Sequence, residues 1–260
     1  MAFFLALNNT YICTMENKSS KIFGIRAIIE AINSGATIQK VYLQKGLSGN
    51  LFSELNTLIK KHSIATSHVP VEKLNHLSKN SNHQGVAATI SPIDFHDLEI
   101  VIESVLNSDK TPLILLLDQI TDVRNFGAII RTAECTGVDA IVVQNQGSAP
   151  LNADAIKTSA GAAFKVPICR VDHLKDALFL LQASEINLVA ATEKTEDTLF
   201  DVNFNQPTAI IMGSEHRGVN PSILKMVNAK AKLPLLGTIE SLNVSVACGA
   251  ILYEALRQRL

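Results

Sequence analysis

The sequence predicts an α/β protein with two parts, a small N-terminal α/β domain and a larger domain built on a doubly wound parallel sheet with helices on both faces. Stretches with helical apolar spacing alternate with short strand-like runs along most of the chain. The run 112–117 is continuously apolar, which is typical of a parallel strand buried on both sides. Charge also divides the chain, since residues 1–90 carry nine Lys+Arg and four Asp+Glu, net +5, whereas residues 91–260 carry 14 and 20, net −6.

Composition restricts the class of protein. Hydrophobic residues make up 47% and charged residues 18% of the 260 positions, which is enough apolar material for a large core. No apolar run reaches the roughly 18 residues of a membrane span. The four cysteines show no Cys-x-x-Cys spacing, so we expect a reducing, cytoplasmic setting and no metal site. Residues 1–20 have no basic segment before their apolar start, and we expect a leader there rather than a signal peptide.

The first domain is expected at residues 21–90. Its positive charge is compatible with a polyanionic partner or with ordinary scatter of surface charge. A loop-to-strand junction, His83-Gln84-Gly85, is read either as a turn that needs glycine or as a polar contact to RNA. The pattern predicts helices at 22–32, 51–59 and 71–77, and strands at 38–43, 64–69 and 85–90.

An acidic stretch at residues 91–110 follows, with Pro92 and a predicted helix at 98–106. Composition changes across it, so we interpret it as a linker. The second domain is then expected at 111–260. Its strands are predicted at 112–117, 140–143, 164–169, 188–191, 209–212 and 231–233, and its helices at 126–136, 152–162, 174–183, 221–226 and from 246 to the C-terminus.

Ligands of open parallel sheets bind beyond the carboxyl ends of the strands, and three loops there carry polar residues. They contain Asp122 to Arg131, Met212 to Gly218, and the stretch 233–245. The third loop places Thr238, Ser241, Asn243 and Ser245 between two apolar segments, although Ser241 and Asn243 also suit a helix cap. The sequence has no Walker A, Gly-x-Gly-x-x-Gly or Gly-x-Ser-x-Gly motif, which disfavours P-loop enzymes, ordinary dinucleotide dehydrogenases and α/β hydrolases.

Taken together, the three loops resemble the SpoU family of RNA ribose 2′-O-methyltransferases in the knotted methyltransferase superfamily. Asn125-Phe-Gly-Ala-Ile-Ile-Arg131, Ile211-Met-Gly-Ser-Glu215-His-Arg-Gly and Leu233-Pro through Ser241-Leu-Asn243 are similar to its three motifs in order and spacing. The first 90 residues resemble the ribosomal-protein-like RNA-binding domain that precedes the catalytic domain in large-subunit ribosomal RNA members. Phe23-Gly-Ile-Arg-Ala and His83-Gln-Gly are the matching pieces.

The resemblance implies a C-terminal trefoil knot that binds S-adenosylmethionine and a homodimer formed through the last helix. It implies that the first domain binds RNA. It also implies a catalytic set and a cofactor set of residues. The catalytic set is Arg131, Asn125, Glu215, Ser241 and Asn243, and the cofactor-binding set is Gly213, Leu233, Leu235, Leu236, Leu242 and Asn243.

By this resemblance Arg131 is the central catalytic residue. Because a guanidinium pKa lies above about 12, we interpret Arg131 as a clamp for phosphate or a developing alkoxide rather than as a base. The alternative is a surface arginine paired with Glu134. Glu215 is expected to hold Arg131 or the cofactor loop, or else to sit as a carboxylate at a helix start. Arg124 and Arg217 are candidate phosphate contacts, and His216-Arg217 departs from the smaller or acidic residues common in the family.

Three functions remain open from the sequence. The first is transfer of a methyl group to a ribose 2′-hydroxyl of large-subunit ribosomal RNA. The second is the same chemistry on transfer RNA, which the separate N-terminal domain disfavours. The third is a catalytically silent RNA-binding protein, which the retained motif residues disfavour.

Overall fold

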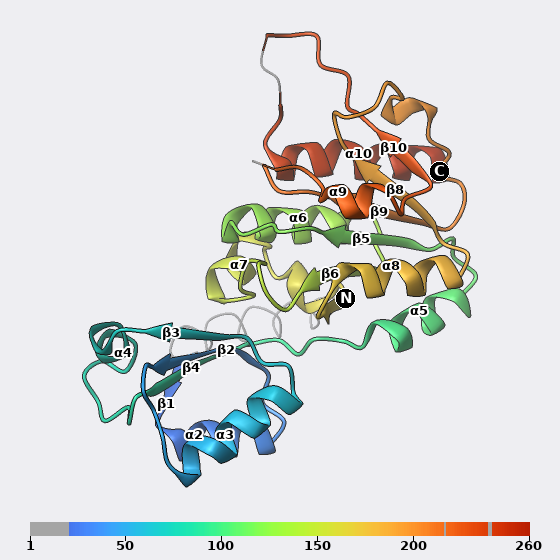
Figure 1. Ribbon diagram of the computed structural model, residues 1–260. Coiled ribbons are helices and arrows are strands. Elements are labelled where there is room, and N and C mark those ends of the chain that lie inside the picture. The colour runs from blue at the N-terminus through green and yellow to red at the C-terminus, as the bar shows by residue number, and fades with distance from the viewer. Residues whose placement is uncertain (1–20, 216, 239–240) are drawn as a thin grey trace, which may run out of the picture. The chain divides into compact units, whose positions relative to one another are not determined.

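A computed structural model describes residues 21–260 except 216, 239 and 240. The expected leader lies outside the described residues. The chain divides into two compact units after Ser91; the described part of the first is 21–91, and the second is Pro92–Leu260 (Figure 1). Within the described part of the chain, no helix has both the length and the apolar character needed to cross a bilayer.

The first unit is a four-stranded sheet between helices. Its elements are β1 (Lys21–Phe23), α2 (Ile25–Asn33), β2 (Ile38–Gln44), α3 (Asn50–Lys61), β3 (Thr66–Val69), α4 (Val71–Leu77) and β4 (Val86–Ile90). The strand order is β1-β4-β2-β3, in which only β2 and β3 run parallel. Helices α2 and α3 pack on one face through a core that includes Ile28, Val41 and Leu55, and α4 packs on the other through Leu74 and Ala87 (Figure 1).

One predicted element of this unit is wrong in part. The helix expected at 22–32 begins only at Ile25, because residues 21–23 form an edge strand paired with β4. Gly24 separates the two with φ 90°, a backbone conformation that glycine adopts without strain. The apolar spacing alone did not reveal this break.

The second unit is a six-stranded, wholly parallel sheet in the order β10-β8-β9-β5-β6-β7. The predicted doubly wound α/β class is confirmed. The elements are α5 (Leu98–Leu106), β5 (Leu113–Leu117), α6 (Val123–Cys135), β6 (Ala140–Gln144), α7 (Ala153–Thr158), η2 (Ala162–Phe164), β7 (Ile168–Val171), α8 (Leu174–Ala183), β8 (Asn187–Ala191), η3 (Leu199–Asp201), β9 (Thr208–Met212), α9 (Pro221–Leu224), β10 (Ala229–Ala231) and α10 (Val244–Arg259).

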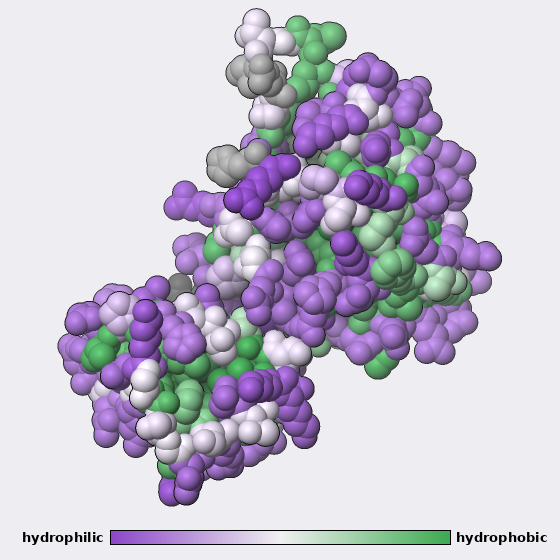
Figure 2. All heavy atoms as spheres, viewed as in Figure 1, coloured by the Kyte–Doolittle hydropathy of each residue, from purple (hydrophilic) through white to green (hydrophobic). Residues whose placement is uncertain are grey.

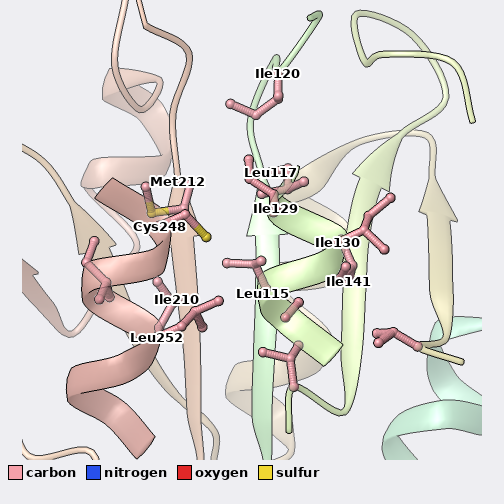
Figure 3. Close-up of a cluster of buried hydrophobic side chains, with 14 of the residues drawn as sticks. Leu115, Leu117, Ile120, Ile129, Ile130, Ile141, Ile210, Met212, Cys248 and Leu252 are labelled. Carbon is pink, nitrogen blue, oxygen red and sulfur yellow. The ribbon is translucent and has the colours of Figure 1, made fainter. Parts of the chain in front are cut away.

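Each face of this sheet has its own core. Because side chains alternate along a strand, Leu115 and Leu117 of β5 point to the layer of α6, α7 and α10, while Ile114 and Leu116 point to α5, α8 and α9. Both sets are buried, which explains the unbroken apolar run. Figure 3 shows the first layer, where Cys248 and Leu252 of α10 lie beside Met212 and Ile210 of β9.

Several boundaries differ from the sequence prediction. The helix expected at 152–162 is two short elements, because Ala160 and Gly161 adopt φ 51° and 85° and end it. The next strand therefore begins at Ile168 rather than at 164. The last strand is 229–231 rather than 231–233. Within the stretch 91–110, expected as a linker, Leu98, Val101 and Ile102 of α5 are buried in the second unit's core.

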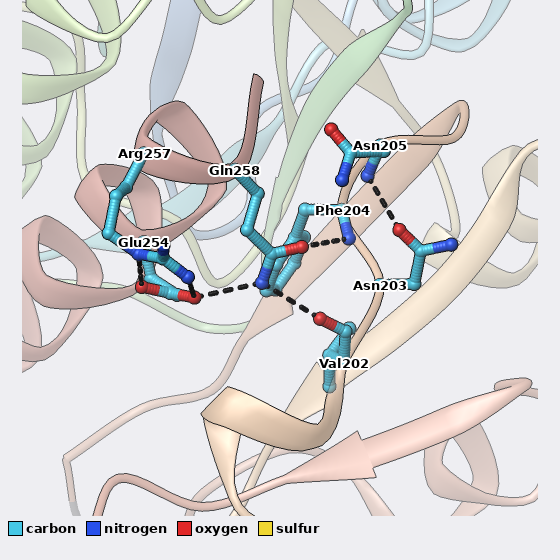
Figure 4. Close-up of polar contacts among 7 residues, drawn as sticks. All are labelled: Val202, Asn203, Phe204, Asn205, Glu254, Arg257 and Gln258. Carbon is cyan, nitrogen blue, oxygen red and sulfur yellow. Dashed lines mark hydrogen bonds and ion pairs between the residues drawn. The ribbon is translucent and has the colours of Figure 1, made fainter. Parts of the chain in front are cut away.

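The C-terminal turn of α10 fastens the segment between β8 and β9. Gln258 accepts a hydrogen bond from the backbone N–H of Phe204 at 2.8 Å and donates to the carbonyl of Val202 at 2.9 Å (Figure 4). Arg259 donates to four backbone carbonyls, those of Thr111, Pro112, Phe204 and Gln206, at 2.7–3.1 Å. Arg257, by contrast, bonds to Glu254 alone among the described residues and is largely exposed.

Replacing Arg259 by alanine is expected to lower the free energy of unfolding by roughly 2–3 kcal/mol, because it leaves several carbonyls without their charged donor. Arg257→Ala is the matched control and should cost about 1 kcal/mol or less, since its ion pair is a surface pair. Urea unfolding of both variants measures the difference. Equal losses would show that the four-carbonyl contact does not anchor the tail.

The expected trefoil knot stays a prediction. Within the segment 192–207, residues 197 and 199 bond to Lys232, which follows β10, and residues 202–206 bond to Gln258 and Arg259 of α10. The segment is thus hydrogen-bonded to the C-terminal part of the chain at two places.

Candidate active site

Polar residues gather at the carboxyl edge of the parallel sheet. Strands β5 and β9 are neighbours, and the loops that follow them begin at Asp118 and Gly213. The loop after β10 leads through residues 232–243 into α10. These are the three loops that the sequence selected, and the strand order brings the first two side by side.

The first loop is shorter than expected, because α6 begins at Val123 rather than at 126. Asp122 is its N-cap, and its carboxylate accepts from the backbone N–H groups of Arg124 and Asn125 at 2.9 and 2.8 Å. Asn125 therefore lies in the first helical turn. Gly127 lets α7 approach, since a Cβ there would stand 2.7 Å from the carbonyl oxygen of Ala155.

Asn125, Glu215 and Asn243 meet in one hydrogen-bonded cluster. Oε1 of Glu215 accepts from Nδ2 of Asn125 at 2.9 Å and from Nδ2 of Asn243 at 2.8 Å. Nδ2 of Asn243 also donates to Oδ1 of Asn125 at 3.1 Å. These hydrogen bonds hold together three residues from the three loops. The sequence placed the three in one catalytic set but did not predict that they bond to one another.

Asn243 also begins the last helix. Its Oδ1 accepts from the backbone N–H and the hydroxyl of Ser245 at 3.0 and 2.6 Å, so it is the N-cap of α10. The backbone N–H of Val244 points to Oε1 of Glu215 at 3.4 Å. The N-terminal ends of α6 and α10, where the helix dipoles are positive, both lie near the Glu215 carboxylate. Asn243 is therefore the helix cap that the sequence allowed, and it is also a member of the cluster.

The Glu215 loop is itself held tightly. Gly213 is buried, and a Cβ there would stand 2.0–2.3 Å from backbone atoms of Gly218 and Val219. Because Gly213 has no side chain, the backbone of residues 218 and 219 can pack directly against it. Asp118, at the end of β5, accepts from the N–H of Asn220 at 2.7 Å, and burial raises the pKa of its carboxyl.

Arg131 is separate from the cluster. It lies six residues after Asn125 on α6, about 9 Å further along the helix axis, and its side chain is exposed. Among the described residues it forms no hydrogen bond with Glu215 or Asn243. The proposed pairing with Glu134 is also not formed there, because Oε1 of Glu134 binds Nζ of Lys165 at 3.0 Å. The guanidinium is therefore available to an anionic ligand.

The third loop presents apolar side chains to solvent, and Figure 2 shows a green, hydrophobic group on this loop. Leu235 is 41%, Leu236 102% and Leu242 43% exposed, whereas Leu233 is half-buried against the core. Within the described part of the loop, the backbones of Leu233, Leu235 and Leu236 have no hydrogen-bond partner. Ser241 is exposed and does not join the cluster. Ile239 and Glu240 lie outside the described residues.

Residues His83 to Gly85 of the first unit form a turn with structural contacts. Nδ1 of His83 accepts from the N–H of Gly85 at 2.9 Å, and Oε1 of Gln84 accepts from the N–H of Ile25 at 3.2 Å. Gly85 has φ 77°, and a Cβ there would meet Leu47 at 2.6 Å. A role in shaping the turn therefore explains all three residues. Arg124 and Arg217 are exposed near the site, and His216 lies outside the described residues.

Two residues of the site were not in the expected set. Asp118 positions the Glu215 loop through Asn220, and Ser245 fixes the orientation of the Asn243 amide. Ser245 could have been found as the second partner of a helix cap. Asp118 could have been found as the buried acid that ends an otherwise apolar strand.

The fold and the cluster define a class: an α/β domain with a polar cluster at the carboxyl edge of a parallel sheet, preceded along the chain by a basic unit. Residues 112–253 match the SpoU rRNA Methylase family, and residues 21–96 match the domain described as RNA 2′-O ribose methyltransferase substrate binding. The chain belongs to the SpoU methylase family, and it is an RNA methyltransferase.

Relatives and solved structures agree with this membership. A Staphylococcus haemolyticus protein named as a TrmH family tRNA/rRNA methyltransferase is 32% identical over 238 residues, 92% of this chain and 95% of the relative. A Staphylococcus aureus protein with the same name is 33% identical over 239 residues, 92% and 96%. The structure of SpoU methyltransferase AviRb from Streptomyces viridochromogenes aligns with TM-score 0.58 and 26% identity over 92% of this chain and 89% of that chain.

Proposed function

We propose that this protein transfers a methyl group from S-adenosylmethionine to a ribose 2′-hydroxyl of RNA, with large-subunit ribosomal RNA as the substrate. The observation that carries the proposal is the cluster of Asn125, Glu215 and Asn243, which joins the starts of α6 and α10 beside the loop 233–242. A structural helix cap needs only Asn243 and Ser245. Glu215 adds a 3.4 Å contact to the N–H of Val244 at the start of α10, but its bonds to the amides of Asn125 and Asn243 go beyond what a cap requires.

The loop 233–242 suits this donor. The adenosine part of S-adenosylmethionine has both apolar surface and hydrogen-bonding groups. The molecule carries its reactive methyl group on a positively charged sulfur. Exposed Leu235, Leu236 and Leu242 offer apolar walls, and the backbone groups of Leu233, Leu235 and Leu236, which bond to none of the described residues, offer hydrogen bonds. Gly213 acts indirectly, since the space beside it is taken by residues 218 and 219 and it shapes the Glu215 loop.

The catalytic roles follow from charge and position. Arg131, exposed and without an ion pair among the described residues, binds a phosphate of the RNA or the oxygen that loses its proton. Asn125 and Asn243 hold the site in shape, and Glu215 fixes both amides. The role proposed for Ser241 is to line the site when RNA is bound.

Ribosomal RNA is preferred over transfer RNA because the chain carries the first unit in addition to the methylase unit. A tRNA-modifying TrmH/SpoU enzyme of A. aeolicus, 32% identical with TM-score 0.53, covers only 62% of this chain and 82% of its own. The intact cluster disfavours a silent RNA-binding protein. We keep transfer RNA as the second candidate because the named relatives are described for both RNAs.

A homodimer and a cytoplasmic location complete the proposal. On α10, Val246, Ala250 and Tyr253 recur at helical spacing and are exposed, while Cys248, Ile251 and Leu252 face the core. An exposed apolar stripe on a helix suits a second copy of the chain.

The experiment is to incubate the protein with radiolabelled S-adenosylmethionine and RNA from a strain that lacks it, and then to map the label. We expect label on a ribose 2′-oxygen of large-subunit ribosomal RNA. Label confined to transfer RNA would select the second candidate. Absence of label on every RNA, with donor binding intact, would favour the silent protein.

A further inference from the structure

A pocket of the first unit lies between β1 and the C-terminal end of α4. Its volume is about 460 Å³, within the range of about 300–1,000 Å³ that is usual for small-ligand sites. Nine described residues line it, and none of them is acidic. Lys21 and Phe23 come from β1, and Lys79 and Asn80 come from the loop after α4. The pocket combines two cations with an aromatic ring that is 36% exposed.

The pocket opens beside two rows of side chains on one face of the sheet. Lys21 pairs with Thr89, which pairs with Lys40 across β4. Phe23 pairs with Ala87, which pairs with Tyr42. Residues directly opposite on paired strands point to the same face, so a basic row lies next to an aromatic row.

Helix α4 packs on this face of the sheet. Ala87 packs with Leu74 of that helix, and α2 and α3 cover the opposite face. Nζ of Lys40 and Nζ of Lys73 each lie 5.7 Å from the centre of the Tyr42 ring. Helix α4 is seven residues long and leaves Phe23, Lys40 and Lys79 at least partly accessible.

Hydrogen bonds within the loop that closes the pocket fix the shape of its backbone. Lys79 and Asn80 adopt φ 53° and 62°, and the N–H of Asn80 bonds to the carbonyl of Asn75 at 2.7 Å. The hydroxyl of Ser78, a residue only 1% exposed, lies 3.3 Å from the carbonyl of Asn75 and 3.1 Å from that of Ser81. His83 binds the Asn75 side chain at 3.0 Å. The loop therefore holds Lys79 near β1 before any ligand arrives.

We propose that this pocket binds one unpaired nucleotide of the RNA substrate, with its base on the Phe23 ring and a neighbouring phosphate between Lys21 and Lys79. Bases splayed from a single strand stack on aromatic rings, and lysines neutralise the phosphates beside them. Residues 21–91 carry eight basic and three acidic side chains, which favours a polyanion over a neutral ligand. The inference rests on the proposed function, because it takes RNA as the substrate.

The test measures binding of the full-length protein to a fluorescent single-stranded RNA of about 12 nucleotides at several salt concentrations. Phe23→Ala is expected to weaken binding roughly 10-fold, and Phe23→Tyr to restore it, because both rings stack. The double variant Lys21→Gln with Lys79→Gln should reduce the slope of log K against log salt by about 0.7, because it removes one single-strand phosphate contact and each such contact contributes about 0.7.

The matched control is Lys60→Gln with Lys61→Gln, which removes the same charge from the end of α3, outside the pocket. It should leave the salt slope unchanged and the affinity within about 3-fold. Equal effects of the two double variants, or tighter binding of a perfect RNA duplex than of the single strand, would overturn the nucleotide pocket. If the unaltered protein neither binds nor methylates any RNA, the proposed function fails, and this is a different observation from a failure of the pocket alone.

Discussion

Arg131→Ala is expected to lower the rate of methyl transfer roughly 100-fold or more while it leaves the affinity for S-adenosylmethionine within about 2-fold. The reason is the position of Arg131, which is exposed, lies about 9 Å along α6 from Asn125, and is bonded to none of the described residues of the cluster or of the loop 233–242. Single-turnover transfer to RNA measures the rate, and equilibrium dialysis measures donor binding.

Arg131→Lys separates charge from shape. A lysine keeps the positive charge but loses the planar fork of donors, so an intermediate rate is expected if Arg131 grips a phosphate or an oxyanion. Lys175→Ala, which removes an exposed cation from α8 on the other face of the sheet, is the control for a general loss of positive charge. A collapse of donor affinity in Arg131→Ala, in parallel with the rate, would show that the clamp assignment is wrong.

Gly213→Ala is expected to lower the free energy of unfolding by about 3 kcal/mol, because the added Cβ would stand 2.0–2.3 Å from backbone atoms that cannot move aside singly. The displaced segment, residues 218 and 219, continues from Glu215, so methyl transfer should fall as well. Urea unfolding gives the stability, and the transfer assay gives the activity.

Gly249→Ala makes the same chemical change in α10 and is expected to act in the opposite direction. Its Cβ would lie 3.8 Å from Thr132, an ordinary contact, and alanine favours a helix over glycine by about 0.5–1 kcal/mol. If both variants lost stability equally, close backbone approach at Gly213 would not be the cause.

The sequence predicted the parallel sheet well because the evidence for it is local. The apolar run of β5, the helices at 98–106 and 174–183, and the glycine after β9 can each be predicted without knowing what lies across the molecule. The motif order then selected Asn125, Glu215 and Asn243, and the structure bonds these three together. Their catalytic roles remain a proposal.

Other features depend on distant contacts and left no local signal. The apolar spacing of residues 22–32 continues through Gly24, and only pairing with β4 makes residues 21–23 a strand. Acidic composition suggested a linker at 91–110, yet three apolar side chains of α5 are buried against α8 and the sheet. Gly213 stays a predicted cofactor contact, and only the structure shows that backbone atoms of residues 218 and 219 occupy the place where its Cβ would stand.

The asparagine pair of the cluster has a kinetic consequence. Asn125 and Asn243 are 118 positions apart and bond to one another only when β5, β9 and β10 are all in place. Contacts between such distant positions form late, since closing long loops has an entropic cost before the contact is gained. Refolding chains should therefore recover helical circular dichroism before they recover enzymatic turnover, so a helix signal overestimates the fraction of competent molecules.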